Sequence, residues 1–267
     1  MIELMNSFPP TEKSQVTLGN WRLPPFNKWG FQNVREIIPT ADIPTNPRDV
    51  WEFSYSSSSI FDDIIINDLQ GGVIHLKQFL DATHTDAFIV IHEGRVLVEY
   101  YANDMLDGKQ HILMSVSKSM LGLLVGILGA QKQLSIEATG AHYIPELKGS
   151  AFEDATLRDL LDMRCALAFD EDYQATSGAI IEYRKATNWN PLEIGEQPSD
   201  LRNFLPTLKE RSGAHGTDMN YISPCTDLLG WIIERATGSR FVNLFSELLW
   251  RPLGAANHAY ITIDRLG

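Results

Sequence analysis

The chain contains little cysteine, no long apolar run and no excess of positive charge. Cys165 and Cys225 are the only cysteines in 267 residues, which excludes a disulfide-rich scaffold and favours two separate buried thiols in a reducing, cytoplasmic setting over one disulfide. The net charge of −12 disfavours nucleic acid and anionic membranes as partners. No segment has the length of a membrane span, and residues 1–7 lack the pattern of a secretion signal.

Signatures of metal and nucleotide chemistry are also missing. The seven histidines form neither a His-Glu-x-x-His pattern nor a close cluster, so we expect no metal site. The glycines at 71–72 and within 122–129 do not form a phosphate-binding loop, so we expect no nucleotide cofactor. Any chemistry of this chain must therefore come from its own side chains.

Apolar residues make up 44% of the sequence, which is enough for one large domain or two lobes. Residues 1–60, rich in Pro, Trp and Phe, predict an irregular arm packed on the body. Two β-rich runs at 87–92 and 95–101 flank a tight Gly-containing turn and predict a hairpin. Helices are predicted at about 76–82, 115–133, 156–163, 199–209, 224–236 and 240–250. A strand at 259–263 is predicted to return to the hairpin's sheet.

The most informative motif is Ser115-Val116-Ser117-Lys118, at the start of the long apolar helix. Residues three apart share a helix face, so Ser115 and Lys118 point the same way. Unpaired backbone N–H groups in the first turn can stabilise an oxyanion. Partial burial favours a neutral Lys118 that can accept the serine proton, which makes Ser115 a candidate nucleophile. The alternative is a capping serine beside a solvated lysine.

A serine–lysine pair of this kind commonly works with a tyrosine that relays protons. Three Tyr-x-Ser/Asn matches occur, at 55–57, 101–103 and 221–223. The first falls in a polar loop, and the second ends the hairpin before the candidate nucleophile. Only Tyr221 follows a helical insert and stands just before a capped helix, where a cleft wall facing Ser115 can be built. We therefore select Tyr221.

At these residues the chain resembles the class C β-lactamase-like serine hydrolases, the penicillin-recognising fold. Residues 114–119 carry the first motif and 220–223 the second, with further similarity at 143–147, 160–163 and 169–173. Together with residues 21–39, these segments are similar to the cytoplasmic branch of amide and carboxylic-ester hydrolases of the 6-aminohexanoate-dimer type. The resemblance implies an α+β fold, in which an α/β lobe with an antiparallel sheet stands beside an all-helical lobe.

The resemblance also implies a division of the chain. Residues 1–60 form the N-terminal arm, and 61–114 form the first part of the α/β lobe with its hairpin. Residues 115–250 comprise the nucleophile helix and the helical lobe, and 251–267 begin the returning sheet.

The resemblance further implies roles for individual residues. Ser115 would be the acylated nucleophile, with Lys118 and Tyr221 as its proton-transfer partners. Tyr173, Ser223, Arg184 and Trp189 would bind substrate, the last two from a loop that faces it. The alternative for Tyr173 is a half-buried aromatic on the surface of the helical lobe.

Arg184 stands near the position where the best dimer hydrolases carry an acidic residue for the substrate's ammonium group. The cationic side chain therefore puts an ammonium-bearing substrate in doubt. It favours a substrate that carries a carboxylate or is neutral.

One feature of the family has no counterpart here. No Lys-Thr-Gly or His-x-Gly triplet follows Tyr221, and the near match at 215–217 precedes it. We therefore expect a fold without the C-terminal strands and last helix, a companion chain or homodimer as a possible partner, and weak or no turnover by the chain alone.

Two functions remain open. The first is a serine hydrolase that cleaves a small amide or ester through an acyl-enzyme on Ser115. The second is a non-catalytic, hydrolase-like scaffold or a split subunit completed by a partner chain. β-Lactamase and D,D-peptidase activities are less expected, because no secretion signal is evident.

Overall fold

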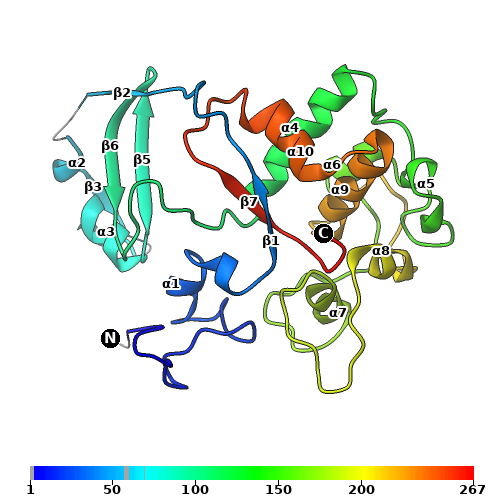
Figure 1. The fold of residues 1–267 in the computed structure, drawn as a ribbon, viewed down its shortest axis with the longest axis horizontal. Helices are drawn as coiled ribbons and strands as arrows, with labels where there is room; N and C mark the ends of the chain where they lie inside the picture. Colours follow the sequence, from blue (N-terminus) through cyan, green and yellow to red (C-terminus); the bar gives the residue numbers. More distant parts are fainter. Residues whose placement is uncertain (1–2, 57–59, 69) are drawn as a thin grey trace.

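The computed structural model describes residues 3–56, 60–68 and 70–267. Ser57, which completes the first Tyr-x-Ser match, therefore lies outside the described residues. The fold mixes helices and sheets (Figure 1), with a β-hairpin on one side, a group of helices on the other and a two-stranded sheet between them. The predicted α+β fold class is confirmed. No helix in the described ranges combines the length and apolar character that a bilayer crossing requires.

The N-terminal arm is largely irregular but holds several short elements. These are α1 (Asn27–Gly30), a 3-10 turn η1 (Val34–Glu36), β1 (Thr40–Ile43) and β2 (Ser54–Tyr55). The arm has a small core of its own, formed by Val16, Trp21, Val34 and Ile38. Burial of these large apolar side chains explains why a segment with so little regular structure is ordered.

The predicted hairpin is confirmed, with β5 (Ala87–His92) antiparallel to β6 (Arg95–Tyr101). β2 pairs parallel with β6, so the sheet order is β2-β6-β5 and β5 forms one edge. Smaller elements precede the hairpin in the chain: α2 (Ile60–Asp63), β3 (Ile65–Asn67), β4 (Val73–His75) and α3 (Leu76–Ala82). The last is the helix predicted at 76–82.

The helical lobe begins with α4 (Val116–Ala130), and it contains helices at 140–143, 145–147 and 179–186 that are not among those predicted from the sequence. Further helical elements follow α4. They are α5 (Gly140–Tyr143), η2 (Pro145–Leu147), α6 (Leu157–Leu161), α7 (Ala179–Ala186), α8 (Leu201–Phe204), η3 (Leu205–Thr207), α9 (Pro224–Thr237), α10 (Phe241–Phe245) and the π-helical turn η4 (Ser246–Trp250). Thr156 and Asp159 form a capping box at the start of α6, which lies within the helix predicted at 156–163. The helix predicted at 240–250 is thus an α-helix that continues as a π-turn.

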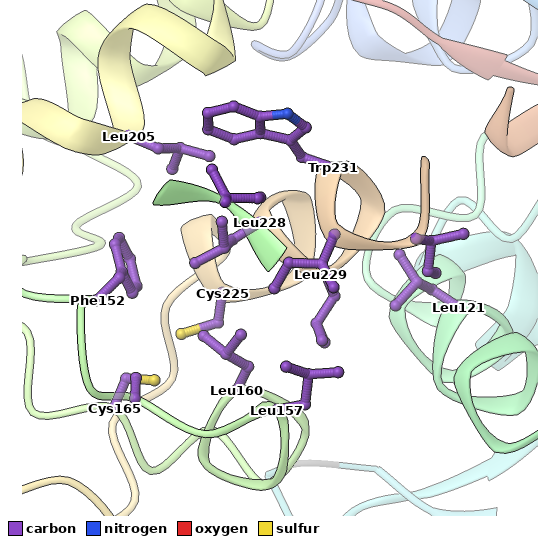
Figure 2. Packing of buried hydrophobic residues seen from close by; sticks show 14 of the residues in the cluster. Leu121, Phe152, Leu157, Leu160, Cys165, Leu205, Cys225, Leu228, Leu229 and Trp231 are labelled. Atoms are coloured by element: carbon purple, nitrogen blue, oxygen red, sulfur yellow. The ribbon is translucent and has the colours of Figure 1, made fainter. Parts of the chain in front are cut away.

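The main hydrophobic core lies between α4, α6 and α9 (Figure 2). Leu121, Leu157, Leu160 and Leu228 are almost completely buried in it. Cys165 and Cys225 are buried in the same core as free thiols, as predicted. This packing fixes the first turn of α4 relative to the first turn of α9, which are the two places where the sequence motifs lie.

The returning strand is confirmed, but its predicted partner is wrong. β7 (Ala259–Thr262) pairs antiparallel with β1 of the arm, in the register Thr40↔Thr262 to Ile43↔Ala259, and does not join the hairpin's sheet. The local sequence pattern of a strand does not determine which strand it pairs with. Here the arm places β1 beside the end of the helical lobe. The edge of β5 is left without a strand beside it among the described residues.

Candidate active site

The backbone turns sharply into α4 at Met114. This residue has φ of 47°, a left-handed conformation that costs energy for a non-glycine residue and is concentrated at functional sites. Ser115 follows as the N-cap residue and is exposed. The turn is held by backbone bonds from Val116 N to Leu113 O (3.1 Å) and from Ser117 N to Met114 O (3.2 Å). The strained residue thus presents Ser115 at the open end of the helix.

Lys118 lies one turn into α4 and meets Ser115 directly. Its Nζ donates to Ser115 Oγ over 3.1 Å, and lies 5.3 Å from the ring centroid of Tyr221. Tyr221 comes from the segment that leads into α9, so the core packing of α4 against α9 brings the three residues together. The structure gathers all three predicted catalytic residues at one place.

These residues line a pocket of about 300 Å³. Ser115, Lys118 and Tyr221 supply its polar wall, and Leu160, Leu161, Met163, Leu121 and Leu229 supply its apolar wall. Met163 has φ of 54°, and its carbonyl accepts from Asn220 N over 2.7 Å. Met163 thereby fixes the residue before Tyr221, a role without a sequence signal.

Ser223 is the N-cap residue of α9, but its side chain does not cap the helix. Its hydroxyl donates to Glu171 Oε1 over 2.6 Å, and its backbone N–H donates to Glu171 Oε2. Sequence reasoning did not single out Glu171. The side chain of Ser223 therefore holds Glu171 beside the tyrosine motif.

A second carboxylate that sequence reasoning missed, Asp227, lies in the first turn of α9. Burial raises the pKa of Asp227 to about 6, against the opposing effects of a hydrogen bond from Tyr183 and the charge of Lys118. The Tyr183 hydroxyl is the donor to Asp227 Oδ2, and burial is the first cause that raises the pKa of Tyr183. An acidic group in the first turn of an amphipathic helix also fits a capping role, so the sequence alone did not distinguish it.

Tyr173 is 70% exposed, and its hydroxyl donates to Glu171 Oε1 over 3.3 Å. Partial burial is the first cause that raises its pKa, and the neighbouring Glu171 and Tyr221 act in the same direction. Tyr173 thus lies on the Tyr221 side of the site. It is more exposed than the alternative interpretation, a half-buried aromatic on the surface of the helical lobe, would have it.

Arg184 does not lie in a loop, which corrects the sequence-based expectation. It is in the last turn of α7 and only 6% exposed. Ile180 is buried one turn earlier, so Arg184 occupies the inward face of the helix. Trp189 follows α7. Its indole N–H donates to Thr262 Oγ1 over 3.2 Å, and its ring packs edge-on against Trp21 at 5.2 Å.

The histidines take structural positions. His111 Nε2 is 2.9 Å from Asp86 Oδ2, and His215 Nδ1 accepts from Ala166 N over 3.0 Å. Within the described ranges, no group of three or more His, Cys, Asp or Glu side chains is arranged to hold a metal ion.

Comparison with known proteins identifies relatives over most of the chain. The Beta-lactamase family profile matches residues 75–263. The 6-aminohexanoate-dimer hydrolase of Paenarthrobacter ureafaciens is 32% identical over 264 residues, which are 97% of this chain and 64% of that protein. A β-lactamase of Pseudomonas fluorescens is 26% identical over 184 residues, covering 65% of this chain and 45% of that protein.

A solved structure from Bacillus anthracis, provisionally named a 6-aminohexanoate-dimer hydrolase, matches with a TM-score of 0.87 and 26% identity. It covers 96% of this chain and 66% of that one. The chain thus spans just under two thirds of the length of these two relatives. Agreement of profile, sequence and structure confirms the resemblance drawn from the motifs: the chain belongs to the β-lactamase family.

Proposed function

We propose that the protein is a serine hydrolase that cleaves a small amide or ester through an acyl-enzyme on Ser115. The observation that carries the proposal is the 3.1 Å contact between Lys118 Nζ and Ser115 Oγ, with Tyr221 beside the lysine. Nucleophilic catalysis requires a base within hydrogen-bond reach of the hydroxyl, and this pair meets that requirement. The relationship to a 6-aminohexanoate-dimer hydrolase supports an amide as one substrate class.

In the acylation step, the Lys118 amine takes the hydroxyl proton as Ser115 Oγ attacks the substrate carbonyl. The carbonyl oxygen becomes an oxyanion at the start of α4, where the backbone N–H of Ser115 has no acceptor among the described residues. The proton then passes to the leaving amine or alcohol through the Tyr221 hydroxyl as the bond breaks. Water repeats the sequence on the acyl group and releases the acid.

The residues that we propose to form the substrate-binding part of the site are Tyr173, Ser223, Arg184 and Trp189. Tyr173 is exposed on the Tyr221 side of the site and suits contact with a bound substrate. Ser223 acts through Glu171, whose carboxylate it binds. We also assign the protein to the cytoplasm, in line with its two free thiols.

A second candidate is a subunit whose site is completed by another polypeptide or by a second copy. One face of α4 favours it. Leu123 is 60% exposed, and a Cβ added at Gly122 or Gly126 meets nothing within 4 Å. A helix that is apolar all round is normally buried. In this version Ser115 acts only in the complex, because a second oxyanion donor comes from the partner.

Pre-steady-state hydrolysis of p-nitrophenyl hexanoate tests the first candidate. We expect a burst of nitrophenol that matches the enzyme concentration, absent in Ser115→Ala. Tyr221→Phe keeps the ring beside Lys118 and should slow the burst by roughly 10²-fold or more. Tyr143→Phe is the matched control, since its hydroxyl accepts from Ser135 N over 2.9 Å, outside the pocket.

A folded parent protein without a burst excludes the first candidate for the chain alone and leaves the second. A burst of equal size in Ser115→Ala excludes Ser115 as the nucleophile.

A further inference from the structure

Two arginine side chains from distant segments meet beside the residues that follow α7. Arg22 comes from the N-terminal arm and donates through Nη2 to Asn190 Oδ1. Asn190 N in turn donates to the carbonyl of Arg184 over 3.0 Å. Figure 1 shows the arm and α7 on the same side of the β1–β7 pair. The Arg22 guanidinium therefore reaches the turn after α7, and it lies close enough to Arg184 for the charge of Arg184 to lower its pKa.

Neither guanidinium has a carboxylate partner among the residues that the structure describes. Arg184 is 6% exposed, and its Nη2 donates only to the backbone carbonyl of Asp172, over 3.2 Å. Arg22 Nε is buried and has no hydrogen-bond acceptor. Buried charges are ordinarily paired, and an unpaired one is costly. No acidic side chain among the described residues therefore compensates the two positive charges.

Burial, and after it the charge of Arg184, lower the pKa of Arg22 to about 10. Arginine side chains keep their charge in proteins, so an anion placed between the two would meet two positive charges. Glu182, two residues before Arg184, pairs instead with Lys185 at 3.1 Å. Asp172, whose backbone carbonyl accepts from Arg184, is exposed, and its Oδ1 accepts from Gln174 N over 2.8 Å.

The arginine pair adjoins the candidate active site. Trp21, next to Arg22, belongs to the apolar cluster that also includes Trp189 and Met114, the residue before Ser115. On the other side, Arg184 lies near enough to Tyr173 to lower the pKa of that phenol, against the larger effects that raise it. The pair therefore flanks the site on the side of Tyr173 and Tyr221.

We propose that Arg22 and Arg184 bind a carboxylate carried by the substrate, at the end away from the scissile amide or ester bond. A guanidinium offers its donors in a planar fork that matches a carboxylate, and two such forks explain the missing acceptor at Arg22 Nε. The same two charges repel a substrate with a terminal ammonium group. This inference rests on the proposed hydrolase function, and it narrows the substrate class to ω-carboxy amides and esters.

Binding of adipate tests the carboxylate site without any need for catalysis. Isothermal titration is made on the Ser115→Ala variant with adipate, dimethyl adipate and 1,6-diaminohexane. We expect adipate to bind at least tenfold more tightly than the ester or the diamine. Arg22→Gln and Arg184→Gln should each weaken adipate binding about tenfold, and Arg202→Gln should not, because Arg202 pairs with Glu234 on the surface.

Because Arg184 is buried, its replacement can unfold the chain, and Arg22→Gln then decides the result. The proposal is overturned if folded Ser115→Ala binds adipate no better than dimethyl adipate. It is also overturned if Arg22→Gln leaves the affinity for adipate unchanged.

Turnover rates show whether the carboxylate that binds Arg22 and Arg184 belongs to the substrate or to another polypeptide. We expect kcat/KM for mono-p-nitrophenyl adipate to exceed that for p-nitrophenyl hexanoate by about tenfold or more, and Arg22→Gln to remove the preference. Adipate binding without this preference in an active enzyme means that the pair holds a carboxylate of another polypeptide, and overturns the substrate assignment. Adipate binding without any acylation of Ser115 contradicts the hydrolase function and leaves the anion site standing.

Discussion

At the scale of single residues, the candidate active site depends on Lys118, whose side chain can both donate and accept a proton. Lys118 Nζ contacts Ser115 Oγ at 3.1 Å and has no carboxylate in an ion pair among the described residues. A lysine can lose its proton and serve as a base, whereas arginine in proteins cannot. Replacement of Lys118 by arginine therefore tests whether proton transfer by this side chain is needed, because arginine cannot act as the base.

Lys118→Arg places a side chain that cannot lose its proton beside Ser115 and should slow acylation of Ser115 by roughly 10²–10⁴-fold, because general base catalysis contributes about that much. The measurement is the rate of covalent labelling by a fluorophosphonate under pseudo-first-order conditions. Lys148→Arg, at an exposed position, is the control and should label at the parent rate. A rate for Lys118→Arg within a few fold of the parent would show that Lys118 does not act as the base.

Asp227 should make stability depend on pH. Its pKa rises from 3.8 to about 6 on folding, so between about pH 4 and pH 6 the folded chain binds more protons than the unfolded chain. Stability therefore falls as pH rises through this window and levels off above it. Asp227→Asn removes this contribution and, by keeping an acceptor for Tyr183, should raise the unfolding free energy at pH 7 by about 1–2 kcal/mol.

Urea unfolding of the parent and of Asp227→Asn at pH 5 and pH 7 measures this effect. The gain from the substitution should be larger at pH 7 than at pH 5. A gain that is larger at pH 5, or a loss at both pH values, would contradict the assigned direction of the pKa shift.

At the scale of elements, α4 combines a catalytic first turn with a helix body that is buried on one side only. Leu124, Val125 and Leu128 are fully buried, whereas Leu123 on the opposite side is 60% exposed. Gly126 lies on that open side, and a Cβ added there meets no atom within 4 Å. Nothing in the packing of the described residues therefore requires glycine at this position.

Gly126→Ala should stabilise the isolated chain by about 0.5–1 kcal/mol, since alanine loses less backbone entropy in a helix. A thermal melt should show a rise in Tm of about 2–4 °C. Gly230→Ala in α9, where an added Cβ also meets nothing, should give a similar gain. A loss of stability confined to Gly126→Ala would mean that the open face of α4 is already covered in solution.

Elements set by local sequence were predictable, and those set by distant contacts were not. The hairpin, α3, the capping box at Thr156 and the left-handed stop at Gly238 each carry their signal within a few residues. The pairing of β7 with β1 joins segments more than 200 residues apart in the chain, and no local pattern specifies it.

The site shows the same contrast. Ser115, Lys118 and Tyr221 could be selected because their spacing and context carry chemistry. The bond of Ser223 to Glu171 joins residues 52 positions apart, and no local pattern specifies it. The resemblance implies a loop position for Arg184, yet this residue faces inward from α7.

At the scale of the whole molecule, the edge strand β5 exposes apolar side chains. Ile89 and Ile91 on this strand are each 49% exposed. An exposed apolar strand at a sheet edge offers unpaired backbone groups to other chains. We propose that this sheet edge is a surface for association with another chain.

Without such a partner, the purified chain should associate as its concentration rises, as followed by light scattering after size-exclusion chromatography. Ile89→Lys places a charge on the β5 edge and should shift the distribution toward monomer. Ile194→Lys alters a fully exposed apolar residue elsewhere and should have little effect. Equal effects of the two substitutions would indicate general solubility and argue against a role for the β5 edge.

The central claim is that Ser115 is an activated nucleophile. Its most direct test is the intact mass of the chain after incubation with a fluorophosphonate, in parallel with Ser115→Ala and with folding of both checked by circular dichroism. We predict one adduct on the parent and none on the variant. A folded parent without an adduct, or an adduct of equal yield on Ser115→Ala, would contradict the claim.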